Sequence, residues 1–316
     1  MTGGVEKVLV TGASGFIGAC LVRSLLAEGQ QVHALLRPGS RPWRLAGLTR
    51  QYTPHAVDLR DAAAVRQAVR ACRPEVIYHL AAHGAYPSQR DRSAILASNV
   101  LGTANLLEAL AGHDYRMFVN TGSSSEYGHK DRSLSEDDIL EPRSDYAVAK
   151  AAATLLCQAE AFRGRPVTTV RIFSAYGPWE DPTRLVPYVM GCCLRGEAPR
   201  LTAGSQPRDF IHVEDVIALL RTAARLPRAR GHILHAGTGR QHRVREMAQT
   251  IVDVCSGGRL TPLFGAEATR PDEPAHWVAR IEKTTALTGW IPVHDLRRGV
   301  ELTWDWFKFQ RVTPAA

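Results

Sequence analysis

Residues 8–18 read Val8-Leu-Val-Thr-Gly12-Ala-Ser-Gly15-Phe-Ile-Gly18 and lie almost at the N-terminus. An apolar run ends at Thr11-Gly12, glycines recur at every third position, and an apolar pattern with helical spacing follows. The segment therefore predicts a strand, a tight turn and a helix. Gly12 gives the turn backbone freedom, Gly15 lets the main chain approach an anion, and Gly18 lets the helix pack on the strand. Such a helix N-terminus is suited to hold the pyrophosphate of a dinucleotide.

Outward from this segment, a second strand-like run at 31–36 completes a strand–helix–strand unit, which makes the glycine pattern much more specific. Further strand-like runs occur at 55–57, 75–82, 117–121, 167–172 and 232–239. Strands that alternate with helical patterns are typical of a doubly wound sheet. We predict an α/β fold with a Rossmann-like, doubly wound parallel sheet of about seven strands in the order 3-2-1-4-5-6-7. A smaller, interwoven C-terminal substrate lobe completes the prediction.

The domain boundary is expected where the sixth strand ends. We predict a dinucleotide-binding domain over residues 1–175 and a substrate lobe over residues 176–316, with 205–239 returning to the sheet. No internal repeat and no low-complexity linker separates the two parts.

Composition restricts the class of protein. The chain has 316 residues, 45% of them hydrophobic and 22% charged, as in soluble globular proteins. No apolar run reaches the roughly 18 residues of a membrane span, and a first strand near residue 7 leaves no room for a signal peptide, so we expect a cytoplasmic protein without a membrane partner. The net charge of +8 comes from scattered basic residues, which argues against a nucleic-acid partner. The six cysteines lack metal-ligand spacing, so they are expected to be reduced, and no metal site is predicted.

A pair of polar residues predicts acid–base chemistry. Tyr146 and Lys150 are four positions apart at the start of a helical segment, so they lie on one face of the helix. A nearby ammonium stabilises a phenolate, and we expect Lys150 to lower the pKa of Tyr146 toward the working pH. The fifth strand runs into the serine-rich turn Gly122-Ser-Ser-Ser-Glu126-Tyr-Gly128 just before this helix.

Together, the Gly-x-x-Gly-x-x-Gly spacing, the serine-rich turn and the Tyr146-x-x-x-Lys150 pair resemble the extended branch of the short-chain dehydrogenase/reductase family. The resemblance covers essentially the whole chain and points to the members that modify nucleotide sugars, as epimerases, dehydratases and 4-ketoreductases. It implies an enzyme that binds a nicotinamide dinucleotide and a nucleotide-diphosphate sugar.

The resemblance also implies catalytic roles. A serine at the end of the fifth strand would bind the reacting oxygen, and we assign this role to Ser124, with Ser123 and Ser125 as close rivals. The sugar 4,6-dehydratases carry Thr-Asp-Glu here, where this chain has Ser124-Ser125-Glu126. Glu126 would be the base of a dehydratase and Ser125 a poor substitute for its acid. Alternatively, Glu126 is a loop carboxylate bonded to backbone.

For the cofactor, the second strand ends in Arg37 and not in a carboxylate, which favours NADP(H) over NAD(H). Alternatively, Arg37 stacks on the adenine. Asp58 would hold the adenine, although it could also cap the following helix, and Asn99 would support Lys150. The full set expected at the cofactor is Gly12, Gly15, Phe16, Ile17, Arg37, Asp58, Leu59, Leu80, Ala81, Ala82, Asn99, Tyr146, Lys150 and Phe173.

For the substrate, Arg208 resembles the family residue that clamps the diphosphate, because a guanidinium fits two phosphate oxygens at once. Its alternative is a structural pairing with Asp209. Arg270 matches a second diphosphate contact. The full set expected at the substrate is His83, Tyr86, Ser123, Ser174, Arg184, Arg208 and Arg270.

The sequence leaves the reaction open among several outcomes. A 4-ketoreductase or a 4-epimerase acting on C4 of a nucleotide-diphosphate hexose is favoured, and a 4,6-dehydratase with Glu126 as base is an alternative. A non-catalytic module that senses NADP(H) is the alternative from another class. By resemblance alone, a homodimer is expected through the helices around 90–112 and 145–163.

Overall fold

A computed structural model describes residues 4–86, 88–268 and 273–312. Within these residues seven strands form one parallel sheet in the order β3-β2-β1-β4-β5-β6-β11. Since β11 is the seventh strand of this sheet along the chain, the predicted order 3-2-1-4-5-6-7 and the predicted fold class are confirmed. The strands are β1 (Lys7–Thr11), β2 (Gln31–Leu36), β3 (Thr53–Ala56), β4 (Val76–His79), β5 (Met117–Ser123), β6 (Val167–Ile172) and β11 (Ile233–Ala236).

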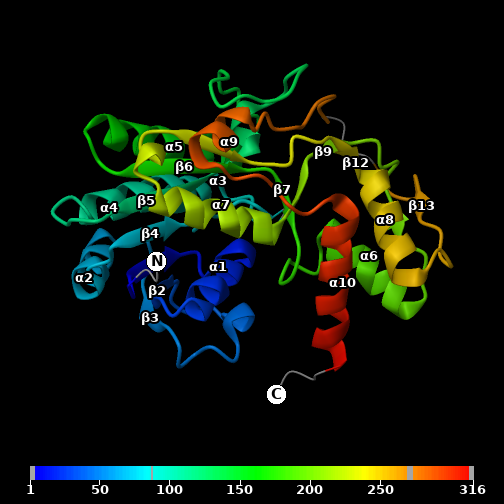
Figure 1. Cartoon of the computed structure of the whole chain (residues 1–316), viewed down its shortest axis with the longest axis horizontal. Helices are drawn as coiled ribbons and strands as arrows, with labels where there is room; N and C mark the ends of the chain where they lie inside the picture. Colours follow the sequence, from blue (N-terminus) through cyan, green and yellow to red (C-terminus); the bar gives the residue numbers. More distant parts are fainter. Residues whose placement is uncertain (1–3, 87, 269–272, 313–316) are drawn as a thin grey trace.

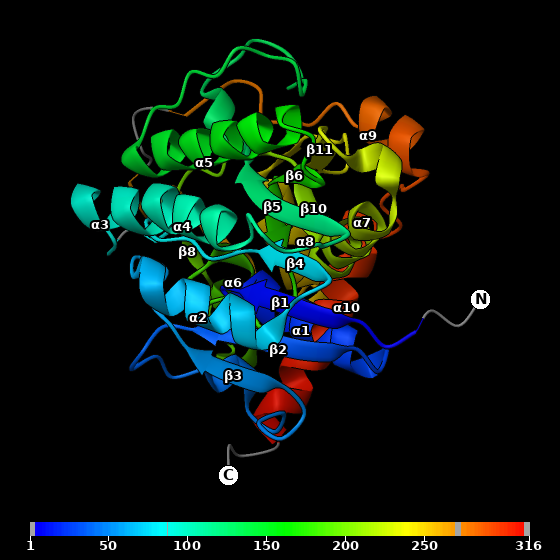
Figure 2. The ribbon, with the colours of Figure 1, turned by 90° about the vertical axis from the view of Figure 1, so that its left-hand side faces the viewer.

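Side chains of the sheet alternate between two apolar layers, as strand geometry requires. Val8 and Val10 of β1 pack toward α1 (Phe16–Ala27) and α7 (Val213–Arg225). Leu9, between them, packs toward the opposite helical layer. That layer consists of α2 (Ala62–Cys72), α4 (Gly102–Ala109) and α5 (Asp145–Phe162). The sheet therefore lies between two helical layers (Figures 1 and 2).

The C-terminal lobe has its own apolar core, on the right of Figure 1. Its main helices are α6 (Leu185–Arg195), α8 (Val244–Ser256) and α10 (Leu296–Val312). Short strand pairs join the lobe to the sheet and stabilise its loops: β7 (Ser174–Tyr176) with β10 (Phe210–His212), β9 (Pro207–Arg208) with β12 (His242–Arg243), and β8 (Arg200–Leu201) with β13 (Leu263–Phe264). After α6 the chain returns through β10, α7 and β11, while α9 (Glu282–Thr288) packs beside β11. The two parts are interwoven.

Helix starts fix the positions of the site residues. Ser144 caps α5 by accepting a hydrogen bond from the Ala147 backbone N–H, 3.2 Å away, so Tyr146 lies in the first turn and Lys150 one turn later. Asp61, not Asp58, caps α2, since its carboxylate accepts from two backbone N–H groups at 3.0 Å. A π-helical turn, Ala97–Leu101, joins α3 (Arg92–Leu96) to α4.

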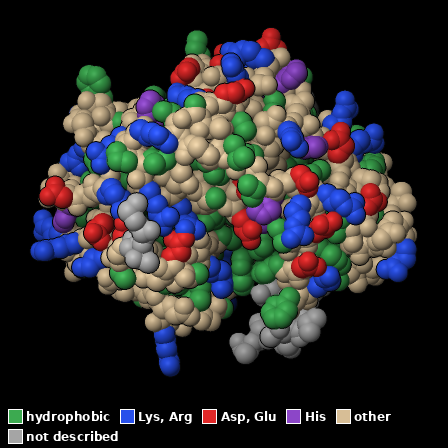
Figure 3. All heavy atoms as spheres, viewed as in Figure 1, with side chains coloured by type: hydrophobic (Ala, Val, Ile, Leu, Met, Phe, Trp, Pro, Cys, Tyr) green, Lys and Arg blue, Asp and Glu red, His purple; other side chains and the backbone are tan. Residues whose placement is uncertain are grey.

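On the face shown in Figure 3, acidic and basic side chains are intermingled, with no continuous basic stripe. Among the described residues, no helix combines the length and apolar character that crossing a bilayer requires.

Candidate active site

A cleft of about 1340 Å³ lies at the carboxyl ends of β1, β4, β5 and β6 and extends to the lobe. Ligands of open α/β sheets bind in this place. The cleft brings together nearly all of the expected site residues. Glu126 and Asn99 do not line it, and Arg270 lies outside the described residues.

The glycine turn at one end of the cleft leaves no room for side chains. Gly12 has a φ of +67°, and a Cβ there would lie 2.6 Å from the backbone nitrogen of Ala81, two residues after β4. A Cβ on Gly18 would overlap the Gly12 carbonyl, which explains why the helix can pack so closely on the strand. Helix α1 starts after Gly15 without a side-chain cap. Its first N–H groups and the bare turn therefore fit a dinucleotide pyrophosphate.

The ends of β2 and β3 form the part of the cleft where an adenosine ribose would lie in this fold. Arg37 is exposed and lines the cleft, as does Asp58. The Asp58 carboxylate accepts two hydrogen bonds from the Arg60 guanidinium, and these bonds, with a smaller effect from Arg37, lower the pKa of Asp58. Asp58 is therefore a charged acceptor at this end of the cleft, next to the cation on Arg37.

The Asn99 side chain bonds the backbone of His83. Its side chain is buried in the π-helical turn, where Oδ1 accepts from the His83 N–H at 2.8 Å and Nδ2 donates to the His83 carbonyl at 2.7 Å. Its expected support of Lys150 stays a prediction. Asn99 satisfies both backbone groups of His83, at the beginning of a loop that lines the cleft.

Tyr146 and Ser123 form the centre of the site. Burial raises the pKa of Tyr146 to about 12, while a hydrogen bond with the Ser123 side chain and the charge of Arg184 act in the opposite direction. Lys150 is buried, and its ammonium donates to the Thr121 carbonyl at the end of β5. The expected lowering of the Tyr146 pKa by Lys150 is therefore not found, because burial dominates. At neutral pH the phenol is protonated.

Of the three rival serines, Ser123 is the one whose side chain acts on the Tyr146 phenol. Ser123 is the last residue of β5 and caps the 3₁₀ turn Ser124–Tyr127, with its Oγ 2.7 Å from the Ser125 Oγ. A sequence signal for this choice was available. Ser123-x-x-Glu126 has the spacing of a capping box, in which side chain and backbone bond reciprocally, and the structure contains that box.

Glu126 lies behind this turn, fully buried, and does not line the cleft. One carboxylate oxygen accepts the Ser123 backbone N–H at 2.7 Å, and the other accepts from Arg171 Nε at 2.8 Å. Both oxygens are thus engaged away from the cleft. The geometry does not support Glu126 as a base, and it matches the alternative of a carboxylate bonded to backbone.

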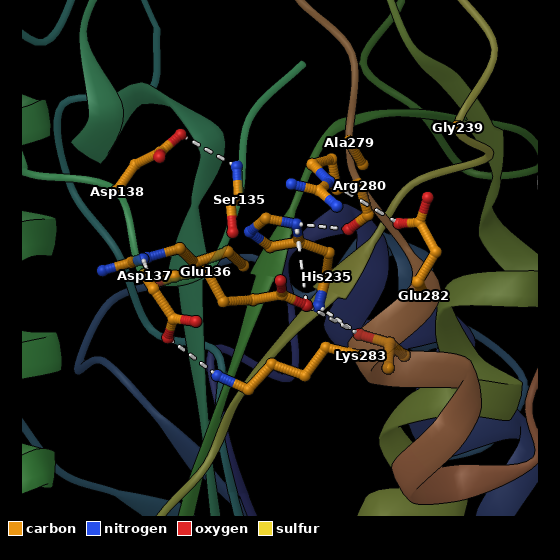
Figure 4. Close-up of polar contacts among 12 residues, drawn as sticks. Ser135, Glu136, Asp137, Asp138, His235, Gly239, Ala279, Arg280, Glu282 and Lys283 are labelled. Carbon is orange, nitrogen blue, oxygen red and sulfur yellow. Dashed lines mark hydrogen bonds and ion pairs between the residues drawn. The ribbon is translucent and has the colours of Figure 1, made fainter.

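The buried polar contacts continue from Arg171 to the C-terminal segment. Arg171 Nη1 donates to the Tyr127 hydroxyl at 2.6 Å, which lies 2.5 Å from His235 Nε2, and His235 Nδ1 is 2.9 Å from the Arg280 carbonyl. A carbonyl only accepts, so the proton is on Nδ1, and the phenol donates to Nε2. Burial lowers the pKa of His235 to about 3. Figure 4 shows His235 beside Glu136, with Lys283 reaching Asp137 below them.

The substrate side of the cleft is formed by residues from both parts of the chain. Arg184, which precedes α6, donates to the Ala85 carbonyl at 2.6 Å and stacks over the Tyr86 ring at 4.9 Å. His83, Ser174 and Phe173 also line this region.

Arg208 lies farther along the same wall of the cleft. Its guanidinium donates to Glu273 Oε2 at 2.8 Å. The alternative pairing with Asp209 is wrong, because the buried Asp209 carboxylate accepts from backbone N–H groups of Thr238, Gly239 and Ala279. Arg208 therefore presents its charge at the cleft and not to its sequence neighbour.

Comparison with known proteins agrees with this geometry. A family model described as "NAD dependent epimerase/dehydratase family" matches residues 8–237. The chain belongs to this family. Members of the family are enzymes, and so is this chain. The expected resemblance to the nucleotide-sugar branch of the extended short-chain dehydrogenases is thereby confirmed.

Individual relatives align with nearly the whole chain. The low-salt glycan biosynthesis protein Agl12 of Haloferax volcanii is 31% identical, over 95% of this chain and 98% of its own. The dTDP-glucose 4,6-dehydratase of Streptomyces griseus is 28% identical, over 96% and 94% of the two chains. Among solved structures, the UDP-glucose 4-epimerase of Thermus thermophilus in complex with NAD is 29% identical, with a TM-score of 0.84 and coverage of 95% and 98%.

Proposed function

We propose that this epimerase/dehydratase family member exchanges a hydride with C4 of a nucleotide-diphosphate hexose. The supporting observation is Tyr146, hydrogen-bonded to Ser123 in the cleft wall, with Lys150 one helical turn away. The nicotinamide dinucleotide, when bound in the glycine turn, supplies and takes back the hydride. Gly12 and Gly15 would hold its pyrophosphate.

In this proposal Tyr146 moves the proton at the C4 oxygen. Its protonated phenol donates to a C4 ketone when the sugar is reduced and recovers the proton when a C4 hydroxyl is oxidised. Ser123 holds the C4 oxygen next to the phenol. Lys150, which bonds the Thr121 carbonyl one helical turn from Tyr146, would stabilise the phenolate as it forms.

Arg184 and Arg208 are proposed to position the substrate. Both line the cleft, and both bring a guanidinium from the lobe side of the molecule. Arg208 would exchange its bond with Glu273 for the substrate diphosphate, because a phosphate with two acceptor oxygens suits the planar fork of the side chain. Arg184 stacked on Tyr86 would shape the hexose pocket.

Among the outcomes this machinery allows, 4-epimerisation is the best supported and 4-ketoreduction is second. The 29% identical Thermus thermophilus structure is named a UDP-glucose 4-epimerase, and epimerisation needs no group beyond those just described. Ketoreduction is favoured by Arg37, because a soluble reductant with a 2′-phosphate would find a cation there. The 4,6-dehydratase is disfavoured, because Glu126 is bound to Arg171 and Ser123 outside the cleft wall.

A panel of nucleotide hexoses and their 4-keto derivatives, with NADPH, NADH or the oxidised forms, tests the proposal. Net consumption of reduced cofactor identifies a 4-ketoreductase, and a C4 epimer formed without net consumption identifies a 4-epimerase. A product lighter by one water identifies a dehydratase. That result would show that Glu126, or another residue, acts as the base that removes the C5 proton. Cofactor binding with no turnover of any sugar would favour the non-catalytic module.

The Tyr146→Phe variant is the control for every positive result. It should lose about 10²–10⁴-fold in kcat, the usual contribution of a positioned acid–base group, while its affinity for the dinucleotide stays within a few-fold. Unchanged turnover in this variant would contradict the proton transfer proposed here.

A further inference from the structure

A second cluster of functional side chains lies outside the cleft. His212 ends β10, Glu214 is in the first turn of α7, and His294 lies just before α10. One donor atom from each of the three lies within 4.8 Å of the others. None of the three lines the cleft, so the proposed sugar chemistry does not use them.

The imidazoles in this cluster have unsatisfied nitrogens. His212 is 1% exposed, and its Nδ1 has no hydrogen-bond partner, while its Nε2 lies 3.5 Å from the Thr303 hydroxyl. The two rings contact each other, with centroids 4.7 Å apart. A buried polar atom without a partner costs about 1–3 kcal/mol, so its retention calls for a ligand.

We propose that His212, Glu214 and His294 bind a divalent transition metal, with Zn²⁺ as the best fit. Imidazole and carboxylate donors suit Zn²⁺, and two tetrahedral bonds of about 2.0–2.1 Å place their donor atoms about 3.3–3.4 Å apart. The distance from His294 Nε2 to Glu214 Oε2 is 3.4 Å, which matches this spacing. His212 supplies the third donor, and water completes the tetrahedron.

The surroundings of the cluster favour a cation. Asp215 is buried, and its Oδ1 lies 3.0 Å from His294 Nδ1, although the two atoms are not aligned for a hydrogen bond. A rotation of the imidazole toward the metal would let this carboxylate accept from Nδ1 and so orient the ring. The two Asp215 oxygens also accept the backbone N–H groups of Val293 and His294 at 3.1 Å, which fixes the segment that carries His294. The positive N-terminal end of α7 opposes a cation, but the carboxylates of Glu214 and Asp215 outweigh this partial charge.

The site is also accessible and able to adjust. The Glu214 side chain is 62% exposed and that of His294 is 15% exposed, so the metal can enter from solvent. These two outer side chains can move toward the fixed, buried His212. The bound metal would join the start of α7, which packs on the sheet, to the segment that leads into α10 of the lobe.

Titration of the full-length, tag-free and chelator-treated chain with ZnCl₂ tests the proposal by calorimetry and by thermal unfolding. One equivalent of Zn²⁺ should bind and raise the Tm, whereas Mg²⁺ should do neither, because it prefers oxygen donors in an octahedron. His294→Gln and Glu214→Gln should each weaken Zn²⁺ binding by more than about 10-fold, since even the loss of a ligand-orienting residue costs about 10–100-fold. The side chains of His294 and Glu214 are both partly exposed, so both variants should fold.

The chain contains a matched control. His242 and Glu246 form an exposed pair with 3.2 Å between Nδ1 and Oε2, and the described residues place no third donor beside them. His242→Gln should leave Zn²⁺ binding unchanged. Binding that survives in His294→Gln would overturn the assignment, as would the absence of stoichiometric binding to the unmodified chain. A strong sulfur-to-metal charge-transfer band with Co²⁺ would also overturn it, by moving the metal to the cysteines.

Discussion

Arg171 and Glu126 form an ion pair with 2.8 Å between Nε and Oε2, in which the side chains are only 1% and 0% exposed. Glu126 also accepts a hydrogen bond from the backbone N–H of Ser123. An ion pair that does not line the cleft therefore positions Ser123, whose side chain acts on Tyr146. Loss of one partner from a buried pair leaves an uncompensated charge, whereas exposed pairs contribute little.

We expect Glu126→Gln to lower the free energy of unfolding by about 3–5 kcal/mol, the typical cost of breaking a buried pair. Urea denaturation followed by circular dichroism measures the change. The matched control is Glu197→Gln, which breaks the exposed Arg195–Glu197 pair and should change stability by less than about 1 kcal/mol. Equal effects of the two substitutions would contradict the structural role given to Glu126.

Ser123→Ala should lower kcat more strongly than Ser124→Ala, by roughly 10-fold or more, because each lost charge-stabilising contact of about 1.4 kcal/mol changes a rate tenfold. Ser123 acts on the pKa of the phenol through its side chain, whereas Ser124 has no such effect. Steady-state kinetics of the two single variants, with the dinucleotide at saturation, provide the comparison. If Ser124→Ala is the slower enzyme, the assignment from the sequence was right and the structural one is wrong.

The pH dependence of stability should follow three buried histidines. Burial lowers the pKa of His79, His212 and His235 to about 3, below the unfolded value of about 6.5. Between these pH values the unfolded chain binds more protons, so stability is complete above about pH 6.5 and falls as the pH drops toward 3, by up to about 1.4 kcal/mol per pH unit and histidine.

Urea midpoints measured from pH 7.5 to 4.5 would show this slope. In His235→Gln the protein should be less stable at pH 7.5, because Tyr127 loses its partner, but its slope should be shallower. A slope identical to that of the unmodified chain would show that His235 does not titrate on unfolding.

Arg37→Ala should weaken the binding of NADPH about 10-fold or more and that of NADH much less, since a charge-assisted bond contributes about 1.5–3 kcal/mol. Arg37 is exposed at the cleft, so the substitution should not disturb folding. The control variant is Arg41→Ala, which removes a neighbouring exposed arginine. An equal loss for both dinucleotides would remove the argument for NADP(H), and the charged Asp58 nearby would then point to NAD(H).

We expect the homodimer interface to include exposed apolar side chains on the α3–α4 segment and on α5. Leu101 is 59% exposed, Leu155 60% and Phe162 94%. Leu155→Arg should convert a dimer to a monomer, as measured by light scattering after gel filtration. The control is Val293→Arg, at a residue that is 72% exposed and lies outside these helices. This substitution should leave the mass of the particle in solution unchanged. A monomeric unmodified chain would contradict this interface.

The sequence predicted the fold well because its signals are local. The glycines at 12, 15 and 18 and the apolar strand runs each specify a short segment, and the order of a doubly wound sheet follows from their alternation. The two-residue strands β8, β9, β12 and β13 are too short to produce a periodic pattern.

The site was harder to predict where contacts link distant segments. Arg171 meets Glu126 across 45 positions, and Asn99 meets the backbone of His83 across 16, through a π-helical turn. Neither contact leaves a local signature. The pKa of Tyr146 depends on how deeply the phenol is buried, which spacing to Lys150 does not reveal.

The position of β11 in the sequence, after a helix of the C-terminal lobe, has a practical consequence for protein engineering. This strand pairs with β6 along residues 233–236, after the chain has already built α6 of the lobe. A fragment that stops near residue 175 would leave β6 as an unpaired edge, prone to pair with other chains. Chimeras that exchange sugar specificity between relatives should therefore graft two separate insertions, before β10 and after β11, and not a single C-terminal half.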